Sequence, residues 1–131
     1  AVGNEALLSI TTGQHNVAVG RDSLQNMTSG SSNTGIGESA LEELTTGTSH
    51  TAVGRNAMSS QQTGNYNTSV GVNSFTTSTN TSSNVGLGYT AGRYIIGSNN
   101  VAVGSGAMNG DSGGSNANSS VAGRINHFCN I

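Results

Sequence analysis

The sequence predicts a parallel β-solenoid, a rod in which each repeat of the chain forms one coil. The main observation is a fixed spacing: an apolar residue followed by Gly recurs every 17 residues, and after 16 residues at the last step. The pairs are Val2-Gly3, Val19-Gly20, Ile36-Gly37, Val53-Gly54, Val70-Gly71, Leu87-Gly88 and Val103-Gly104. A period of this length is typical of stacked coils that share a core. We therefore expect about seven coils, in a chain that serves as a rod or a surface rather than a catalyst.

The composition agrees with such a coil and not with an ordinary globular core. Of the 131 residues only 32% are apolar and 8% are charged, with no Pro, no Trp and no Lys. An aperiodic chain of this composition would be disordered. Because stacked coils share their core, one or two apolar side chains per coil are sufficient. We expect the solenoid to span residues 1–108, with 109–131 forming a degenerate last coil and a C-terminal cap or junction.

A short strand is predicted before each Gly of the repeat. We number each coil from the apolar residue of its Val-Gly pair, which is position 0. Position −2 is β-branched and position −1 is small, an alternation that is typical of a strand. The predicted strands are Val17–Val19, Thr34–Ile36, Thr51–Val53, Thr68–Val70, Val85–Leu87 and Val101–Val103.

The two faces of this strand lead to a prediction about assembly. We expect position 0 to point into the coil. The buried stack would then consist of Val19, Ile36, Val53, Val70 and Leu87. The small column at position −1 would face outward, with the members Ala18, Gly35, Ala52, Ser69, Gly86 and Ala102. A solvated strand face usually carries larger side chains, so we expect a close-packed neighbour there, most simply copies of the same chain in a homotrimer.

The return leg of the coil, after the Gly, allows two interpretations. Asp22, Ser39 and Asn56 at position +3 are good N-cap residues. Apolar residues follow at positions +5 and +8, and Gly stands at position +11 of the early coils, where a helix would end. This pattern fits one or two helical turns per coil. A second short strand after an Asn, Asp or Ser turn fits equally well, so both interpretations stay open.

Two polar columns are expected along the corners of the coils. Position +14 is nearly always Asn, which tolerates left-handed backbone and can bond the same amide in the next coil. That column consists of Asn16, Asn33, His50, Asn67 and Asn84, with Asn100 one place early. Position +2 carries Arg21, Glu38 and Arg55 in consecutive coils. Stacking at about 4.8 Å would place their alternating charges in one solvated ladder.

No catalytic, cofactor-binding or metal-binding residues are predicted. His15 and His50 occupy different positions of the coil, His127 follows the repeats, and no cysteine or acidic cluster completes a metal site. Cys129 is the only cysteine, so one chain cannot form a disulfide. A net charge of −2 without Lys gives no electrostatic footprint for nucleic acid. No apolar stretch has the length of a membrane span, and we expect neither nucleic acid nor membrane insertion.

The motif Asn-Val-Ala-Val-Gly, at residues 16–20 and 100–104, resembles the head repeat of trimeric autotransporter adhesins. The stretch from Ile36 to His50 follows a longer form, Val-Gly-x-x-Ala-Leu and then Thr-Thr-Gly-x-x-Asn, with Ile in the first place and His in the last. That form is similar to repeats in phage tail fibres and in surface proteins of large viruses. The resemblance covers residues 1 to about 105. It implies trimers of left-handed β-rolls that bind host surfaces, located outside the cell or on the virion.

The favoured function is a non-enzymatic structural and adhesive module of a trimeric surface fibre, a virion tail fibre or a bacterial adhesin head. Its receptor would be a host-surface glycan or protein. A self-assembling extracellular filament is the alternative, because coils can also stack from subunit to subunit. The chain begins inside a repeat and without Met, and we expect it to be a piece of a longer protein.

Two further classes fit the sequence less well. A ladder-type ligand- or ice-binding role would use Thr11, Thr28 and Thr45, but Gln62 interrupts that column. An acyltransferase of the left-handed helix type would have a slightly longer period and a working His, and neither is present.

Overall fold

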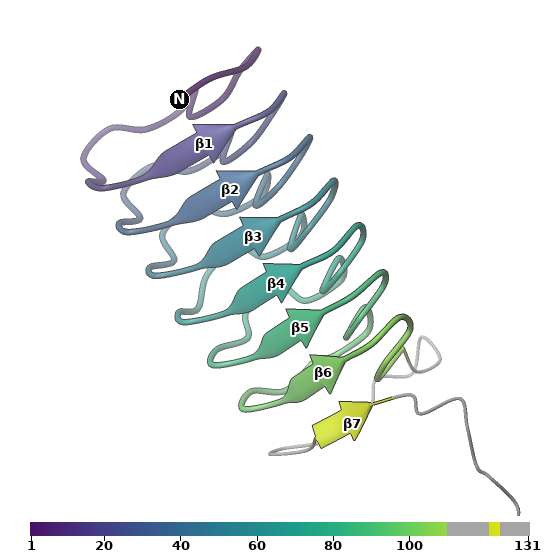
Figure 1. The fold of residues 1–131 in the computed structure, drawn as a ribbon. Helices are drawn as coiled ribbons and strands as arrows, with labels where there is room; N and C mark the ends of the chain where they lie inside the picture. Colours follow the sequence, from purple (N-terminus) through teal and green to yellow (C-terminus); the bar gives the residue numbers. More distant parts are fainter. Residues whose placement is uncertain (110–120, 124–131) are drawn as a thin grey trace, which may run out of the picture.

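The computed structural model describes residues 1–109 and the backbone of 121–123, which form a parallel β-solenoid (Figure 1). Seven three-residue strands lie side by side in one sheet, in the order of the sequence. They are β1 (Val17–Val19), β2 (Thr34–Ile36), β3 (Thr51–Val53), β4 (Thr68–Val70), β5 (Val85–Leu87), β6 (Val101–Val103) and β7 (Val121–Gly123). The first six have the predicted bounds, and the predicted parallel β-solenoid is confirmed.

The period of the sequence becomes the register of the sheet. Val17 in β1 pairs with Thr34 in β2, and each later strand repeats this parallel pairing. The shortened repeat is absorbed before β6, where Val85 pairs with Val101. Strand β7 extends the sheet beyond β6. Residues 110–120 and 124–131 lie outside the described part of the chain, so the predicted cap or junction there stays a prediction.

The glycine that follows each strand is required by both conformation and space. Gly20, Gly37 and Gly54 have φ values of 128°, 132° and 131°, which residues with a side chain rarely adopt. A Cβ on Gly20 would lie 2.5 Å from the carbonyl oxygen of Gly37 in the next coil. The glycine therefore ends the strand and lets the chain turn directly against the neighbouring coil.

The return leg is neither a helix nor a second strand, so both sequence interpretations are wrong. It is a turn with alternating left-handed residues: Asp22 and Leu24 have φ values of 58° and 54°, and Ser39 and Leu41 have 55° and 55°. A left-handed leucine costs about 1–2 kcal/mol. Complete burial of these leucines offsets that cost by about 1.5–3 kcal/mol each. The Leu24 N–H donates to the carbonyl of Ala40 in the next coil at 3.0 Å, so the turns stack as the strands do.

The prediction of which strand face is buried is wrong. In the small column Ala18 is 1% exposed and Ala52 is fully buried, so position −1 points into the coil. The column that we expected to form the core lies on the surface instead. It consists of Val19, Ile36, Val70 and Leu87, each 39% exposed, and the half-buried Val53.

The core is filled from the return leg, and this explains the small column. The large buried side chains come from positions +5 and +8. They are Leu24, Met27, Leu41, Leu44, Met58, Phe75 and Ile95. These side chains reach across the coil to the strand backbone: a Cβ on Gly35 would lie 3.3 Å from Leu24 Cγ and 2.7 Å from Ser23 Oγ. The close neighbour that the small column implies is therefore the return leg of the same solenoid, not a second chain.

The tightest packing is at Phe75, whose ring takes the space of two missing side chains. A Cβ on Gly86 would lie 2.3 Å from Phe75 Cε2, and a Cβ on Gly92 would lie 2.6 Å from Cε1. We therefore expect Gly86→Ala to lower the free energy of unfolding by about 1–3 kcal/mol. Denaturant unfolding of the full chain measures this loss. Alanine is otherwise the commonest residue in this column, so the cost arises from the ring and from Ser74 Oγ, which would lie 2.8 Å from the added Cβ, and not from the strand.

A double-mutant cycle provides the control for Gly86→Ala. Phe75→Leu places at this position the residue that three earlier coils carry. In that background we expect Gly86→Ala to cost clearly less, because the ring is gone, with a remaining cost from Ser74 Oγ, which would lie 2.8 Å from the added Cβ. Equal costs in the two backgrounds would show that Phe75 does not limit the size of residue 86.

The Asn column lies in a corner and joins the coils through backbone groups. The side-chain oxygen of Asn33 accepts a hydrogen bond from the His50 N–H at 2.9 Å, and its amide nitrogen donates to the Gly47 carbonyl at 2.8 Å. Neighbouring rungs repeat this pair of bonds. Within the described part of this column only Asn100 and Asn84 join amide to amide, at 3.1 Å. The expected amide ladder is thus mostly replaced by bonds that satisfy buried backbone groups.

Candidate functional site

The most extended feature of the surface is the outer side of the sheet, which we call the strand face. It comprises positions −2 and 0 of each strand, whose side chains lie opposite the buried position −1, together with the exposed flanking positions −4 and +2. Twelve large hydrophobic side chains are exposed in the described part of the chain, and ten of them belong to the strand face. The ten are Val2, Val17, Val19, Ile36, Tyr66, Val70, Val72, Leu87, Tyr89 and Val103. A chain that is mostly polar therefore gathers its exposed apolar surface on one side.

The centre of the strand face is uniform from coil to coil. In β1 to β6, position 0 is Val, Ile or Leu and position −2 is Val or Thr, so neither column carries a charge. β-Branched side chains have few rotamers to lose, because χ1 is already restricted. Another surface can therefore pack against this centre at a low cost in side-chain entropy.

The two edges of the strand face vary in size and charge. Position −4, just before each strand, carries His15, Ser32, Ser49, Tyr66, Ser83 and Asn99. Position +2, just after the glycine, carries Arg21, Glu38, Arg55, Val72, Tyr89 and Ser105. All twelve of these residues are exposed. The +2 edge is charged beside β1 to β3 and apolar beside β4 and β5.

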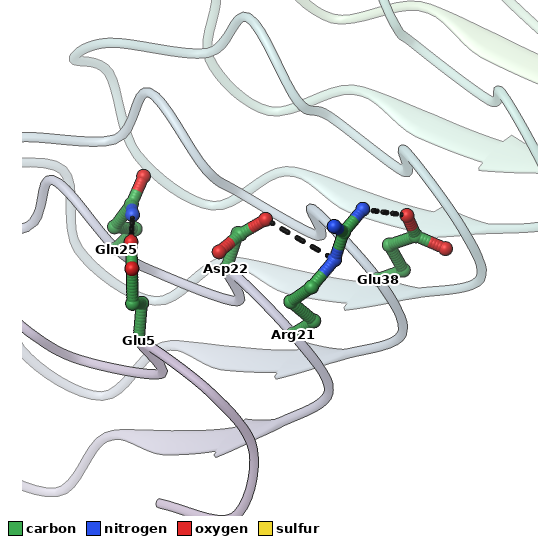
Figure 2. Close-up of polar contacts among 5 residues, drawn as sticks. All are labelled: Glu5, Arg21, Asp22, Gln25 and Glu38. Atoms are coloured by element: carbon green, nitrogen blue, oxygen red, sulfur yellow. Dashed lines mark hydrogen bonds and ion pairs between the residues drawn. The ribbon is translucent and has the colours of Figure 1, made fainter.

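Arg21 links two coils at the charged end of the +2 edge (Figure 2). Its Nη2 donates a hydrogen bond to the carboxylate of Glu38 in the next coil, and its Nε lies 3.4 Å from Asp22 Oδ2. The hydrogen bond to Glu38 and the charge of that carboxylate raise the pKa of Arg21. This pair is the first rung of the charge ladder expected from the sequence.

The rest of that ladder is not formed. Among the described residues no ion pair joins Glu38 to Arg55, so the alternating charges pair only once. Away from the strand face, the Gln25 amide donates to Glu5 in the preceding coil, as Figure 2 also shows. Exposed contacts of this kind contribute little to stability, and we assign the charged end no chemical role.

The three histidines do not come together. His15 is exposed at the −4 edge, His50 is wholly buried in the Asn column, and His127 lies outside the described residues, as does Cys129. Within the described part, no three His, Cys, Asp or Glu side chains are placed to hold a metal ion, and no pocket is found.

His50 takes the place of an Asn and makes the same two bonds. Its Nδ1 accepts the Asn67 N–H at 3.3 Å, and its Nε2 lies 3.0 Å from the Gly64 carbonyl oxygen. This pattern requires the proton on Nε2 and a neutral ring, because Nδ1 must accept. Burial lowers the pKa of His50 to about 4, although the bond from Nε2 to the Gly64 carbonyl opposes the shift.

The threonine column uses its hydroxyl groups internally. The side-chain oxygens of Thr11, Thr28 and Thr45 donate to carbonyl oxygens in the next coil, at 2.8, 3.2 and 2.9 Å. These protons are therefore not directed at a ligand.

Sequence reasoning missed the strand face because it assigned position 0 to the core. A signal was present: positions +5 and +8 already supply large apolar side chains, and Thr34, Thr51 and Thr68 at position −2 are poor core residues. One thin coil cannot bury large apolar side chains at positions 0, +5 and +8 together. One of these three columns must therefore lie on the surface.

Comparison of the chain with known protein families, curated proteins and solved structures found no match. The resemblance of the repeat to adhesin heads and tail fibres therefore remains an expectation. No helix within the described residues is long and apolar enough to cross a membrane.

Proposed function

We propose that the chain is a non-enzymatic structural and adhesive module of a trimeric surface fibre, in which three solenoids pack through their strand faces. The observation that carries the proposal is the gathering of ten exposed large hydrophobic side chains on one face. Contiguous exposed apolar surface is a mark of an interaction site. The likeness of the repeat to trimeric adhesin heads and tail fibres supports this role, with a host-surface glycan or protein as receptor.

The dimensions of the strand face suit three copies. Six strands about 4.8 Å apart, and seven residues of about 3 Å each, give a face of about 600 Å². Three such faces bury about 1,800 Å² over the whole trimer, or about 600 Å² for each pair of subunits, so the assembly depends on all three contacts together. Closed into a triangular prism, they leave about 6 Å between each backbone face and the axis. Val, Ile and Leu side chains from three subunits can fill that space at the density of a protein interior.

The mass of the protein in solution tests the assembly. We expect light scattering to give three times the 13.1 kDa of one chain. Val70→Asp should give the monomer mass with an unchanged far-UV circular dichroism spectrum, because Val70 is 39% exposed in a single chain and would be buried among three. Ile96→Asp is the matched control, since Ile96 is 57% exposed but lies off the strand face, and it should stay trimeric.

Three outcomes would contradict the proposal. A wild-type monomer would remove the need for a partner chain. A mass that grows with concentration would favour the filament, in which coils stack from one subunit to the next. A Val70→Asp variant that keeps the wild-type mass would show that the strand face is not the interface.

A further inference from the structure

We propose that neighbouring subunits meet edge to edge and in register, with Tyr66 of one subunit packed against Val72 of the next. The contact joins the −4 edge of one strand face to the +2 edge of its neighbour and closes the ring of three. This inference rests on the proposed function, because it needs the strand faces to enclose a common axis.

The register follows from symmetry. A threefold axis parallel to the stacking direction rotates each subunit without shifting it along the rod. Each coil therefore lies at the height of the same coil of the next subunit. Because the strands run across the rod (Figure 1), position −4 of a coil then meets position +2 of that same coil. Tyr66 and Val72 flank β4 in this way, and they are 66% and 36% exposed in the single chain.

The sizes of the edge residues are complementary in the four rows beside β2 to β5. Where position +2 has a long side chain beside β2, β3 and β5, position −4 is Ser. These rows pair Ser32 with Glu38, Ser49 with Arg55, and Ser83 with Tyr89. Beside β4 the relation is reversed, because the shorter Val72 faces the bulky Tyr66.

A single chain gives no reason for this relation, since the two positions lie beyond opposite ends of the strand. Contact between subunits does give one, because a well-packed interface tolerates neither a void nor an overlap. The Tyr66–Val72 row is the apolar one, and it lets the tyrosine ring pack while its hydroxyl group stays at the wet rim.

The first row departs from the relation. His15 and Arg21 are both long, but here Arg21 turns to Glu38 and Asp22 of its own chain (Figure 2). That ion pair draws the guanidinium along the edge toward the next coil, which leaves room for His15. The size relation therefore governs the rows beside β2 to β5, where most of the exposed apolar surface lies.

Disulfide trapping tests the contact in the full chain with Cys129→Ser as background. After oxidation, Tyr66→Cys combined with Val72→Cys should run mainly as a covalent trimer on a non-reducing gel and as a monomer after reduction. Each single variant should stay monomeric on that gel, since its thiols face no other thiol. Tyr66→Cys with Glu38→Cys is the control: the two rows are about 9.6 Å apart along the rod, too far for a disulfide.

A size exchange in another row gives independent evidence. Ser49→Tyr places a ring opposite Arg55, and we expect it to weaken the trimer at least about tenfold in dissociation constant. Adding Arg55→Val recreates the Tyr66–Val72 row one coil away and should restore wild-type assembly. The backbone permits the tyrosine, because Ser49 and Tyr66 have φ values of 58° and 61°.

The outcomes separate this inference from the proposed function. A wild-type monomer in solution overturns both. A wild-type trimer in which the Tyr66→Cys, Val72→Cys pair stays unlinked overturns the edge contact alone, and cross-linking that ends at a dimer overturns the threefold closure. A Ser49→Tyr defect that Arg55→Val does not relieve overturns the size relation.

Discussion

Replacing Ala52 with arginine is expected to unfold the solenoid, at a cost of more than about 4 kcal/mol in the free energy of unfolding. Ala52 lies in β3 with no exposed surface, and its side chain points at the return leg rather than at solvent. The thin coil has no room for a guanidinium group there and no partner for its charge. Loss of the β-sheet signal in far-UV circular dichroism would show the effect.

Val70→Arg is the matched control for Ala52→Arg. Val70 is one coil away and one position along the strand, but its side chain is 39% exposed. We expect this variant to keep the β-sheet signal and to lose only its oligomeric mass. If Ala52→Arg stays folded while Val70→Arg unfolds, the inner and outer sides of the strand are the reverse of those described above.

The strand positions could be predicted from the sequence because local chemistry determines them. A β-branched residue, a small residue and an apolar residue before a glycine define a three-residue strand, and β1 to β6 have those bounds. The choice of inner face could not be predicted in the same way. Alternation identifies two faces of the strand but does not show which of them is buried. The small residues at position −1 are explained equally well by a close-packed partner chain and by a return leg that lies close inside a thin coil.

The return leg was misjudged because its residues suit several conformations. Asp22 and Ser39 are good N-caps, but short polar residues of this kind also adopt left-handed backbone, and here they have φ values of 58° and 55°. A left-handed Leu24 is contrary to local preference. The burial that Leu24 gains when the coils stack compensates for the cost of its left-handed backbone. That burial cannot be predicted from the sequence until the cross-section of the coil is known.

The candidate site could not be predicted for the same reason, because the sequence does not show which face of the strand is exposed. The sequence showed a polar chain without a catalytic or metal-binding cluster, and it showed the columns of the repeat. It did not show that positions −4 and +2 border one exposed face. The size relation between Tyr66 and Val72 becomes visible only when both are placed on that face.

Acidification is expected to destabilise the solenoid through His50. Its ring is wholly buried and neutral, and its Nδ1 accepts the Asn67 N–H. Folding lowers the pKa of His50 from 6.5 to about 4, so the unfolded chain binds the proton more readily. The contribution is complete above the pKa of the unfolded state and is lost as the pH falls from 6.5 toward 4. We expect a loss of about 3 kcal/mol over that interval, measured by denaturant unfolding at a series of pH values.

His50→Asn should remove this part of the pH dependence while keeping the fold. The Asn33 side chain already makes the two bonds that the substitution requires, one to a backbone N–H and one to a carbonyl of the next coil. His15→Asn is the control, because His15 is exposed and makes no rung of the column. It should leave the acid-induced loss in place. An unchanged loss in His50→Asn would instead assign the acid sensitivity to carboxylates, since protonation of residue 50 could then no longer contribute.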